Sequence, residues 1–402
     1  MEIYKYLPLA SDRMGILWTL SSIEGSCILE FGPAGTTHYA IEGIGSLNSS
    51  EGAKTYSTHM DEKDVTFGKM QKLEKAILEI NENIKPKYIF VMASSIASII
   101  GADIKATCDV LQDQVEANLI PIEVGGFKGD YAKGVEEALL IVAKNLVKKT
   151  NEKKDTYNLL GCNIDQYQFE SDCNEVMRMM DTFFNKEVQA VFTASSSVEM
   201  LEDAAKASLN IVLRREALPM ALWMEKVHGI PYIYQKPYGL EGTLKFIRNI
   251  SEKMHWEVNE GNLAKEVAQI KKYSMQLKRH FYSYEGCKAC AIYGDYDKAL
   301  GMKALLEEMG LEVDKMQVIH SVKEERIDTG YQERERMTYL KERPLYCLLA
   351  DGATLKMAHQ AKGCLQISNP NMDQSIVYPY TPFVGLRGML WMIQVILNVK
   401  VH

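Results

Sequence analysis

Cysteine thiols are the most reactive side chains in this chain of 402 residues, which contains eight of them. Two form the pattern Cys287-Lys288-Ala289-Cys290. Zinc sites and dithiol redox motifs use this spacing when it lies on a loop or at the start of a helix. Here it leads into an apolar run that predicts a strand, on which residues three apart point to opposite faces. The sequence therefore favours a structural role for this pair.

The remaining cysteines are spread singly along the chain. A long chain without a signal sequence is expected to keep such thiols reduced, and a free cysteine is usually a small core residue. Five lie in apolar or helical contexts and predict core positions: Cys108, Cys162, Cys173, Cys347 and Cys364. Cys27 lies in an apolar run just before a glycine-rich turn, so it is either a buried strand residue or a ligand at that turn.

The turn itself reads Gly32-Pro33-Ala34-Gly35. Two glycines around a Pro-Ala pair allow positive φ angles and the close approach of another group. Gly32 and Gly35 therefore either line a loop that holds a ligand or cluster, or make a tight strand-to-helix turn with nothing bound. Both interpretations are compatible with the sequence.

A second candidate for binding is the pair Arg214 and Arg215, which follows the apolar run 211–213. If that run is a strand, both arginines lie at its carboxyl end, where α/β sheets bind anions. They would then face a ligand cavity and recognise a carboxylate or another anion. The alternative is an ordinary ion pair with Glu216 or another acid.

These residues are positioned by an alternation of apolar runs and amphipathic helical segments, which is typical of α/β folds with parallel sheets. A charged stretch near residue 150 and a long helix ending near 284 divide the chain. We expect three Rossmann-like, doubly wound domains at 1–150, 151–284 and 285–382, with the carboxyl-terminal helix 383–402 joining the first. The predicted strands are 88–93, 119–124, 157–161, 190–194, 211–214, 231–234, 289–293, 316–319, 345–350 and 365–368.

Three predicted strands end in turns where such sheets bind ligands: 161–163, 294–296 and 351–353. None carries the dinucleotide-binding glycine pattern, and no phosphate-binding P-loop is present. The net charge is −7 without a basic block, so nucleic acid is not an expected partner. The apolar stretch 389–399 is too short to span a membrane, and no signal peptide is visible. We expect a cytoplasmic protein.

Three segments together resemble the nitrogenase component 1 superfamily: Pro8–Ser11, Phe31–His38 and Ala93–Asp103. In that family each carries a cysteine that binds a metal cluster. Here the matching residues are Ser11, Thr36 and Ser95, which we call the three cluster positions. Further segments resemble the family in the same order along the chain: 57–68, 100–104, 224–231 and 379–388.

The resemblance implies three Rossmann-like domains and a homologous component 1-type subunit in a hetero- or homo-oligomer. It also implies a separate ATP-dependent iron–sulfur reductase that supplies electrons, and a cofactor or tetrapyrrole that binds among the three domains. An iron–sulfur cluster needs about four thiolates, occasionally replaced in part by other ligands. Any cluster would therefore be supplied mainly by a partner subunit, with Asp12 and Cys27 as possible ligands from this chain.

Two hypotheses follow. In the first, the chain is a subunit of a nitrogenase-like reductase that passes electrons to an unidentified substrate. In the second, it is a non-catalytic scaffold, cofactor carrier or sensor that kept the fold and lost cluster binding. No cysteine lies near Leu213, where nitrogenase catalytic subunits hold their cofactor, so a nitrogen-fixing catalytic subunit is not expected.

Overall fold

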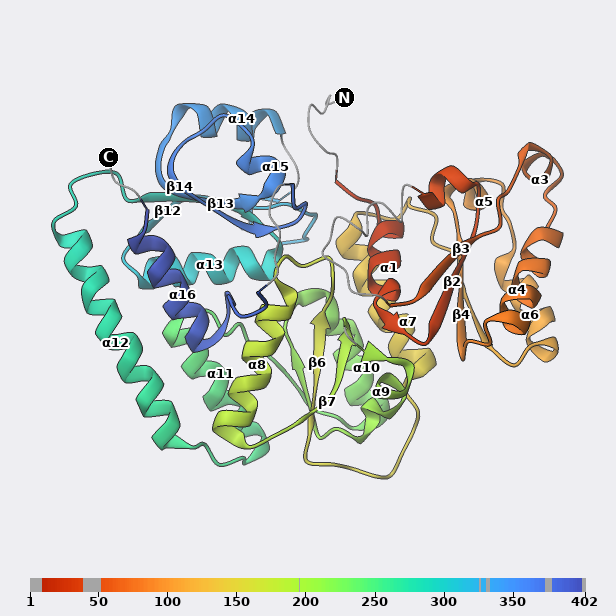
Figure 1. The fold of residues 1–402 in the computed structure, drawn as a ribbon, viewed down its shortest axis with the longest axis horizontal. Helices are drawn as coiled ribbons and strands as arrows, with labels where there is room; N and C mark the ends of the chain where they lie inside the picture. Colours follow the sequence, from red (N-terminus) through yellow and green to blue (C-terminus); the bar gives the residue numbers. More distant parts are fainter. Residues whose placement is uncertain are drawn as a thin grey trace.

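The computed structural model describes residues 9–38, 52–194, 196–324, 327–329, 333–372 and 378–399. Pro8 and residues 400–402, which belong to predicted segments, lie outside the described residues. The described chain is built around three four-stranded sheets, and every strand pair within them is parallel (Figure 1). Each sheet draws its strands from one of the three predicted ranges. We call the three parts the first, second and third units.

The first sheet is buried on both faces. Its order is β3-β2-β4-β5, with bounds Lys54–Ser57, Ser26–Phe31, Tyr88–Ala93 and Asn118–Ile122. On one face, α4 (Gln71–Asn83) and α6 (Ile104–Leu111) cover alternate strand residues, and on the other α1 (Asp12–Ser21) and α7 (Tyr131–Leu146) cover the rest. This two-sided burial explains why the central strands are continuous apolar runs.

The other two sheets are built in the same way. The second has the order β10-β9-β6-β7, with bounds Tyr232–Tyr234, Leu209–Val212, Tyr157–Cys162 and Val188–Thr193. The third has the order β12-β11-β13-β14, with bounds Glu312–Val318, Ala289–Gly294, Pro344–Asp351 and Gln360–Ser368. The helices around them are α8 (Phe169–Phe184), α10 (Leu218–His228), α11 (Gly239–Met254), α12 (Glu260–Tyr282), α13 (Tyr296–Glu308) and α14 (Glu333–Glu342).

All three sheets share one topology. If the four strands of each unit are numbered along the chain, every sheet has the order 2-1-3-4. The order reverses between the first and third strands, which are β2 and β4, β6 and β9, and β11 and β13. In open α/β sheets, ligands bind outside the carboxyl ends of the strands at this switch point. The topology therefore predicts ligand-binding positions at the carboxyl ends of these three pairs of strands.

The units are joined by more than the connecting chain. A short parallel pair links β1 (Ile23–Glu24) of the first unit to β8 (Ser196–Ser197) of the second. One hydrophobic cluster contains core residues of both the first and second units, and another runs through the second and third. The second unit therefore shares one core with the first unit and another with the third.

The carboxyl-terminal helix lies in a different place from the predicted one. We expected residues 383–402 beside the first unit, but α16 (Gly385–Leu397) packs against α8, α11 and α12 (Figure 1). Its buried residues Leu386, Met389, Met392, Ile393 and Ile396 belong to the hydrophobic cluster of the second and third units. The apolar face of α16 thus completes the core around α8, α11 and α12. In the described residues, no helix is both long and apolar enough to cross a membrane.

Candidate functional site

The three cluster positions lie on one side of the first unit. Ser11 immediately precedes α1, Thr36 follows the turn after β2, and Ser95 begins α5 (Ser95–Ile99) after β4. A Cβ atom placed on Gly126 would lie 3.3 Å from Ser11 Oγ and 3.4 Å from Ser95 Oγ. A Cβ on Gly32 would lie 3.3 Å from Thr36 Oγ1. The switch point of the first sheet therefore brings these positions into one neighbourhood.

The side chains at these positions do not fit an iron–sulfur cluster. Ser95 Oγ donates a hydrogen bond to the Gly125 carbonyl oxygen at 2.6 Å, and Thr36 Oγ1 donates to the Pro33 carbonyl oxygen at 2.8 Å. Cluster iron is held by deprotonated thiolates, whereas these hydroxyls keep their protons for backbone acceptors. Among the described residues, no group of three or more His, Cys, Asp and Glu is arranged to hold a metal ion.

A buried ion pair lies beside the cluster positions. Arg13 Nη2 donates to Glu30 Oε1, and both side chains are buried. Thr37 Oγ1 donates to Glu30 Oε2 at 2.8 Å, and Thr36 Oγ1 lies 3.4 Å from Glu30 Oε1. Removing either charged partner would leave the other buried and unpaired, which costs more than the pair itself gains. Both carboxylate oxygens of Glu30 thus have partners, while Arg13 Nε is buried without a hydrogen-bond partner among the described residues.

The two nearby ligand candidates have other surroundings. Asp12 is fully buried, and its two carboxylate oxygens accept the backbone N–H groups of Arg13 and Lys128, each at 2.9 Å. Cys27 is buried near the amino end of β2, and burial raises the pKa of its thiol. At about 3.3 Å per residue, Cys27 lies about 16 Å along the strand from Gly32. The structure brings Asp12, but not Cys27, close to the cluster positions.

The two glycines of the predicted ligand loop differ. A Cβ on Gly32 would meet Ser94 Cβ at 2.5 Å, so this position requires glycine for close packing of the turns after β2 and β4. A Cβ on Gly35 would have no atom of the described residues within 4 Å, and Gly35 is exposed. Gly35 therefore lies on the accessible part of the loop.

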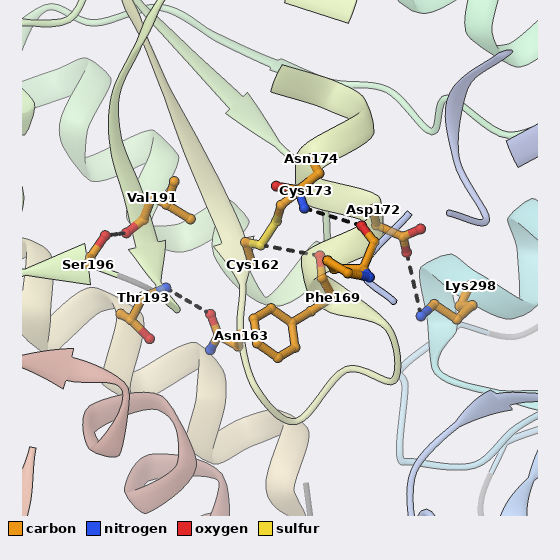
Figure 2. Close-up of a disulfide and its surroundings, with 11 residues drawn as sticks. Cys162, Asn163, Phe169, Asp172, Cys173, Asn174, Val191, Thr193, Ser196 and Lys298 are labelled. Atoms are coloured by element: carbon orange, nitrogen blue, oxygen red, sulfur yellow. Dashed lines mark hydrogen bonds and ion pairs between the residues drawn. A yellow bond between two sulfur atoms is a disulfide. The ribbon is translucent and has the colours of Figure 1, made fainter. Parts of the chain in front are cut away.

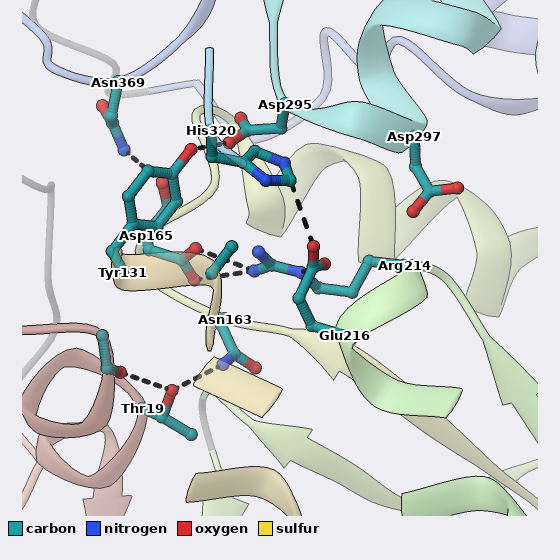
Figure 3. Close-up of polar contacts among 12 residues, drawn as sticks. Thr19, Tyr131, Asn163, Asp165, Arg214, Glu216, Asp295, Asp297, His320 and Asn369 are labelled. Carbon is teal, nitrogen blue, oxygen red and sulfur yellow. Dashed lines mark hydrogen bonds and ion pairs between the residues drawn. The ribbon is translucent and has the colours of Figure 1, made fainter. Parts of the chain in front are cut away.

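A second polar cluster lies where the three units meet (Figure 3). Arg214, which follows β9, is 1% exposed. Its Nη1 donates to Asp165 Oδ1 and Oδ2 at 2.9 and 2.8 Å, and its Nε donates to Glu216 Oε2 at 2.7 Å. The predicted ion pair between Arg214 and Glu216 is confirmed. A Cβ on Gly161, whose φ is +89°, would lie 2.4 Å from Arg214 Cγ, so glycine makes room for the arginine stem.

The first and third units contribute the other side of this centre (Figure 3). Tyr131 of α7 donates its hydroxyl to Asp295, which follows β11. Ser368 Oγ donates to the same carboxylate at 2.9 Å. His320 Nε2 accepts the backbone N–H of Tyr296 at 3.1 Å and lies 3.9 Å from Glu216 Oε1. The ends of β9 and β11, which belong to different sheets, are thus connected through side chains.

Opposing electrostatic effects act on the acids of this centre. Burial favours the neutral form of Glu216, but the Arg214 guanidinium and His320 together outweigh it and hold the pKa of Glu216 below its ordinary value. Asp297 receives the backbone N–H of Arg215 at 2.6 Å, yet burial raises the pKa of Asp297, against the opposing effect of Lys236. The ionised form is therefore better stabilised at Glu216 than at Asp297.

Three buried polar atoms at this centre have no hydrogen-bond partner among the described residues: Arg214 Nη2, His320 Nδ1 and Asn369 Oδ1. Buried polar groups are usually paired, so such a concentration calls for an explanation. Each atom can still donate a hydrogen bond to a small polar molecule or accept one from it. The family resemblance placed a cofactor or substrate among the three domains, and these groups are suited to contact one.

Arg215 lies on the surface side of the same segment. Its guanidinium stacks on Tyr296 at 4.8 Å from the ring centroid, and its Nη1 lies 3.0 Å from Glu324 Oε2. The hydroxyl of Tyr296 also donates to Glu324 at 2.6 Å. Both arginines are thus engaged with acids of this chain. Sequence reasoning named the strand-end turns that contain Asn163 and Asp295, but it did not find the partners that reach them from other units.

The cysteines give one confirmation and two corrections. Cys364, which we expected in the core, is exposed on β14, whose first residues alternate between exposed and half-buried. Cys287 is exposed and Cys290 buried, as expected for a pair that enters a strand and does not converge. Cys162 and Cys173, which we expected as separate reduced core thiols, form a disulfide (Figure 2). That expectation was wrong because the turn after β6 returns the chain along α8, which brings the two Cα atoms to 6.6 Å.

Comparison of the sequence with those of known proteins identifies several relatives. Nitrogenase iron-molybdenum cofactor biosynthesis protein NifE of Clostridium pasteurianum is 31% identical over 301 residues, covering 73% of this chain and 64% of the relative. NifE of Nostoc sp. is 26% identical over 400 residues, covering 93% and 80%. The nitrogenase molybdenum-iron protein alpha chain of Clostridium pasteurianum is 30% identical over 201 residues, covering 49% and 37%.

A solved structure of nitrogenase Cp1 at pH 6.5 has the same fold, with a TM-score of 0.83 and 16% identity. The superposition covers 99% of this chain and 93% of that one. The sequence also matches a family model over residues 11–400, which is nearly its whole length. The chain belongs to the nitrogenase component 1 type oxidoreductase family.

Proposed function

We propose that this chain is a subunit of a cytoplasmic, nitrogenase-like reductase and that it contributes shape and interface in place of cluster ligands. It pairs with a homologous component 1-type subunit, and a separate ATP-dependent iron–sulfur protein supplies electrons to the pair. The observation that carries the proposal is the state of the three cluster positions. They share one neighbourhood, as in a family member, but they present protonated hydroxyls beside the Arg13–Glu30 ion pair.

The thiolates of any interface cluster then come mainly from the partner subunit. The exposure of Gly35 leaves space for a neighbouring chain to approach the turn after β2. The unpaired atoms at the three-unit centre support a polar substrate there. Because Arg214 is 1% exposed, access to this centre requires some movement of the units.

The test is anaerobic co-expression of this chain with a homologous component 1-type subunit from the same organism, followed by iron and acid-labile sulfide analysis and a visible spectrum. We expect iron in the pair and none in this chain alone. In a second arm, Ser11→Ala, Thr36→Ala and Ser95→Ala are combined in this chain. If the partner supplies the ligands, the iron content of the pair is unchanged. A pair without iron would refute the proposal, and loss of iron in the triple variant would refute the assignment of ligands to the partner.

A second candidate function is a scaffold, cofactor carrier or sensor. It is favoured by the two NifE relatives, whose name describes cofactor biosynthesis, and by the closed packing of Arg214 with Asp165. The two functions differ in what the ATP-dependent iron–sulfur protein does. A reductase stimulates its ATP hydrolysis and oxidises it in the presence of substrate, whereas a scaffold receives a preformed metal cofactor and passes it on without sustained turnover.

A further inference from the structure

The disulfide between Cys162 and Cys173 lies at the switch point of the second sheet. Cys162 is the last residue of β6, and Cys173 lies in the second turn of α8 (Figure 2). The two residues are 11 apart in sequence, so the bond closes the whole connection between the strand and the helix. We call residues 163–168 the β6–α8 loop.

A cavity of about 220 Å³ borders this disulfide. Both cysteines line it, together with Phe169, Glu170, Asn174, Met177, Val191 and Ala194. Glu170 is exposed and Asn174 is half-buried, so the cavity reaches solvent. A cavity of about 150 Å³ already holds a molecule the size of benzene. The space beside the sulfur atoms is therefore large enough for a small thiol, although both cysteines are buried by their other neighbours.

The β6–α8 loop contacts the first unit. Asn163 Nδ2 donates to Thr19 Oγ1 of α1 at 3.0 Å. The amide oxygen of Asn163 accepts the backbone N–H of Thr193 at 3.2 Å, and Thr193 Oγ1 donates to the Thr19 carbonyl oxygen at 2.6 Å. All three residues are fully buried. The start of the loop thus connects α1 to the end of β7.

The same loop contacts the third unit and the segment before α16. Asn369 Nδ2 donates to the Asp165 carbonyl oxygen at 2.8 Å, and Lys298 Nζ donates to the Tyr167 carbonyl oxygen at 2.6 Å. Both of these contacts use a carbonyl oxygen of the loop backbone, and they hence depend on the path of the chain between the two cysteines. One short loop therefore connects all three units.

We propose that Cys162 and Cys173 form a redox-active pair whose reduction by a small dithiol loosens the contacts between the units. A thiolate of the dithiol enters the cavity and attacks one sulfur, which breaks the Cys162–Cys173 bond and forms a mixed disulfide. The displaced cysteine leaves as a thiolate and takes a proton from water. The second thiol of the reductant then releases the other cysteine and closes a cyclic disulfide. Two electrons and two protons pass from the dithiol to the protein.

The chemical test uses the full chain, folded and without denaturant. The oxidised protein is titrated with dithiothreitol, and free thiols are trapped with iodoacetamide and located by peptide mass spectrometry. We expect Cys162 and Cys173 to become alkylated together, while the buried Cys347 stays unlabelled. Two outcomes would overturn the proposal: labelling of the pair only after the protein is unfolded, or two free thiols that diamide, a thiol oxidant, cannot join in the folded protein.

The structural test measures amide hydrogen exchange of the β6–α8 loop and of α1 before and after reduction. We expect at least a tenfold faster exchange in the loop of the reduced protein. The variant Cys173→Ser should exchange fast with or without dithiothreitol, and the matched control Cys364→Ser should respond like the wild type. If Cys173→Ser does not fold, comparison of the oxidised and reduced wild type still tests whether the disulfide controls the loop. Equal exchange in both redox states of the wild type would show that the disulfide does not control the loop.

Discussion

Replacing Arg214 with methionine removes the only guanidinium that contacts both Asp165 and Glu216 in the described residues. Methionine keeps much of the stem volume, so the change tests the charge more than the packing. The arginine makes three hydrogen bonds of 2.7–2.9 Å to two buried carboxylates. Breaking a buried ion pair from one side costs about 3–5 kcal/mol, because the remaining charge is left unpaired. We expect Arg214→Met to lose stability in this range.

The loss of stability in Arg214→Met should increase with pH. In the wild type, Arg214 and His320 hold the pKa of Glu216 below its ordinary value, so this stabilisation is present at neutral pH and is lost as the pH falls through that lowered pKa. In the variant, burial acts without the opposing arginine and raises the pKa of the carboxyl. A raised pKa makes the folded state lose stability as the pH rises. The variant should therefore fall further behind the wild type at pH 8 than at pH 5.

The measurement is urea unfolding followed by circular dichroism and tryptophan fluorescence, at both pH values. Trp18, one of four tryptophans, lies with its ring centroid 5.9 Å from that of Tyr131, so part of the fluorescence comes from this centre. Asp165→Asn alone and combined with Arg214→Met completes a double-mutant cycle, in which we expect a coupling of at least about 1 kcal/mol. A loss below about 1 kcal/mol in Arg214→Met, or additive single variants, would refute the reasoning.

Three further outcomes are expected. A Cβ on Gly134 would lie 1.8 Å from a backbone oxygen of α1, so Gly134→Ala should lower the free energy of unfolding by about 1–3 kcal/mol. The control Gly35→Ala, whose Cβ would have no atom of the described residues within 4 Å, should leave it unchanged. Equal stabilities of the two variants in urea unfolding would contradict the close contact between α1 and α7. Cys287 should react with a maleimide in the folded protein, whereas Cys347, whose pKa burial raises, should react only on unfolding, as mass spectrometry can show. Glu202→Gln should cost about 1 kcal/mol at pH 7 in urea unfolding, because Glu202 is bonded to two lysines and a tyrosine. Burial tends to raise the pKa of Glu202, but the hydrogen bonds from the lysines and Tyr88 outweigh burial and lower it. The difference in stability between the wild type and Glu202→Gln should therefore shrink as the pH falls through that lowered pKa.

The sheets were predictable because their central strands are continuous apolar runs between amphipathic helices. All ten predicted strands overlap observed ones, and β4 has the predicted bounds. The polar edge strand β3 was missed because it has no apolar run. Helix α1 was missed for the opposite reason: nearly all of its residues are buried, so no polar face marks its period. The same lack of local signal hid the position of α16, which depends on packing.

The site was only partly predictable. Arg214 was found because it follows an apolar run, and its pairing with Glu216 is local in sequence. Its contact with Asp165 spans 49 residues, and the bond from Tyr131 to Asp295 spans 164. Contacts of this range depend on how whole units pack, which no local pattern encodes. The disulfide is more local, since its partners are 11 residues apart in one unit, but they face each other only after α8 has folded back along β6.

The crossing of α1 and α7 has a mechanical consequence. A Cβ on Gly15 would lie 2.0 Å from the Tyr131 carbonyl oxygen, so at this point the two helices touch backbone to backbone. The Tyr131 N–H also donates to the Ala10 carbonyl oxygen at 2.8 Å. With no flexible side chain between them to absorb a displacement, a shift of Ser11 must carry Tyr131 with it. A displacement of the cluster positions by a docking subunit would therefore also move the Tyr131 hydroxyl that donates to Asp295.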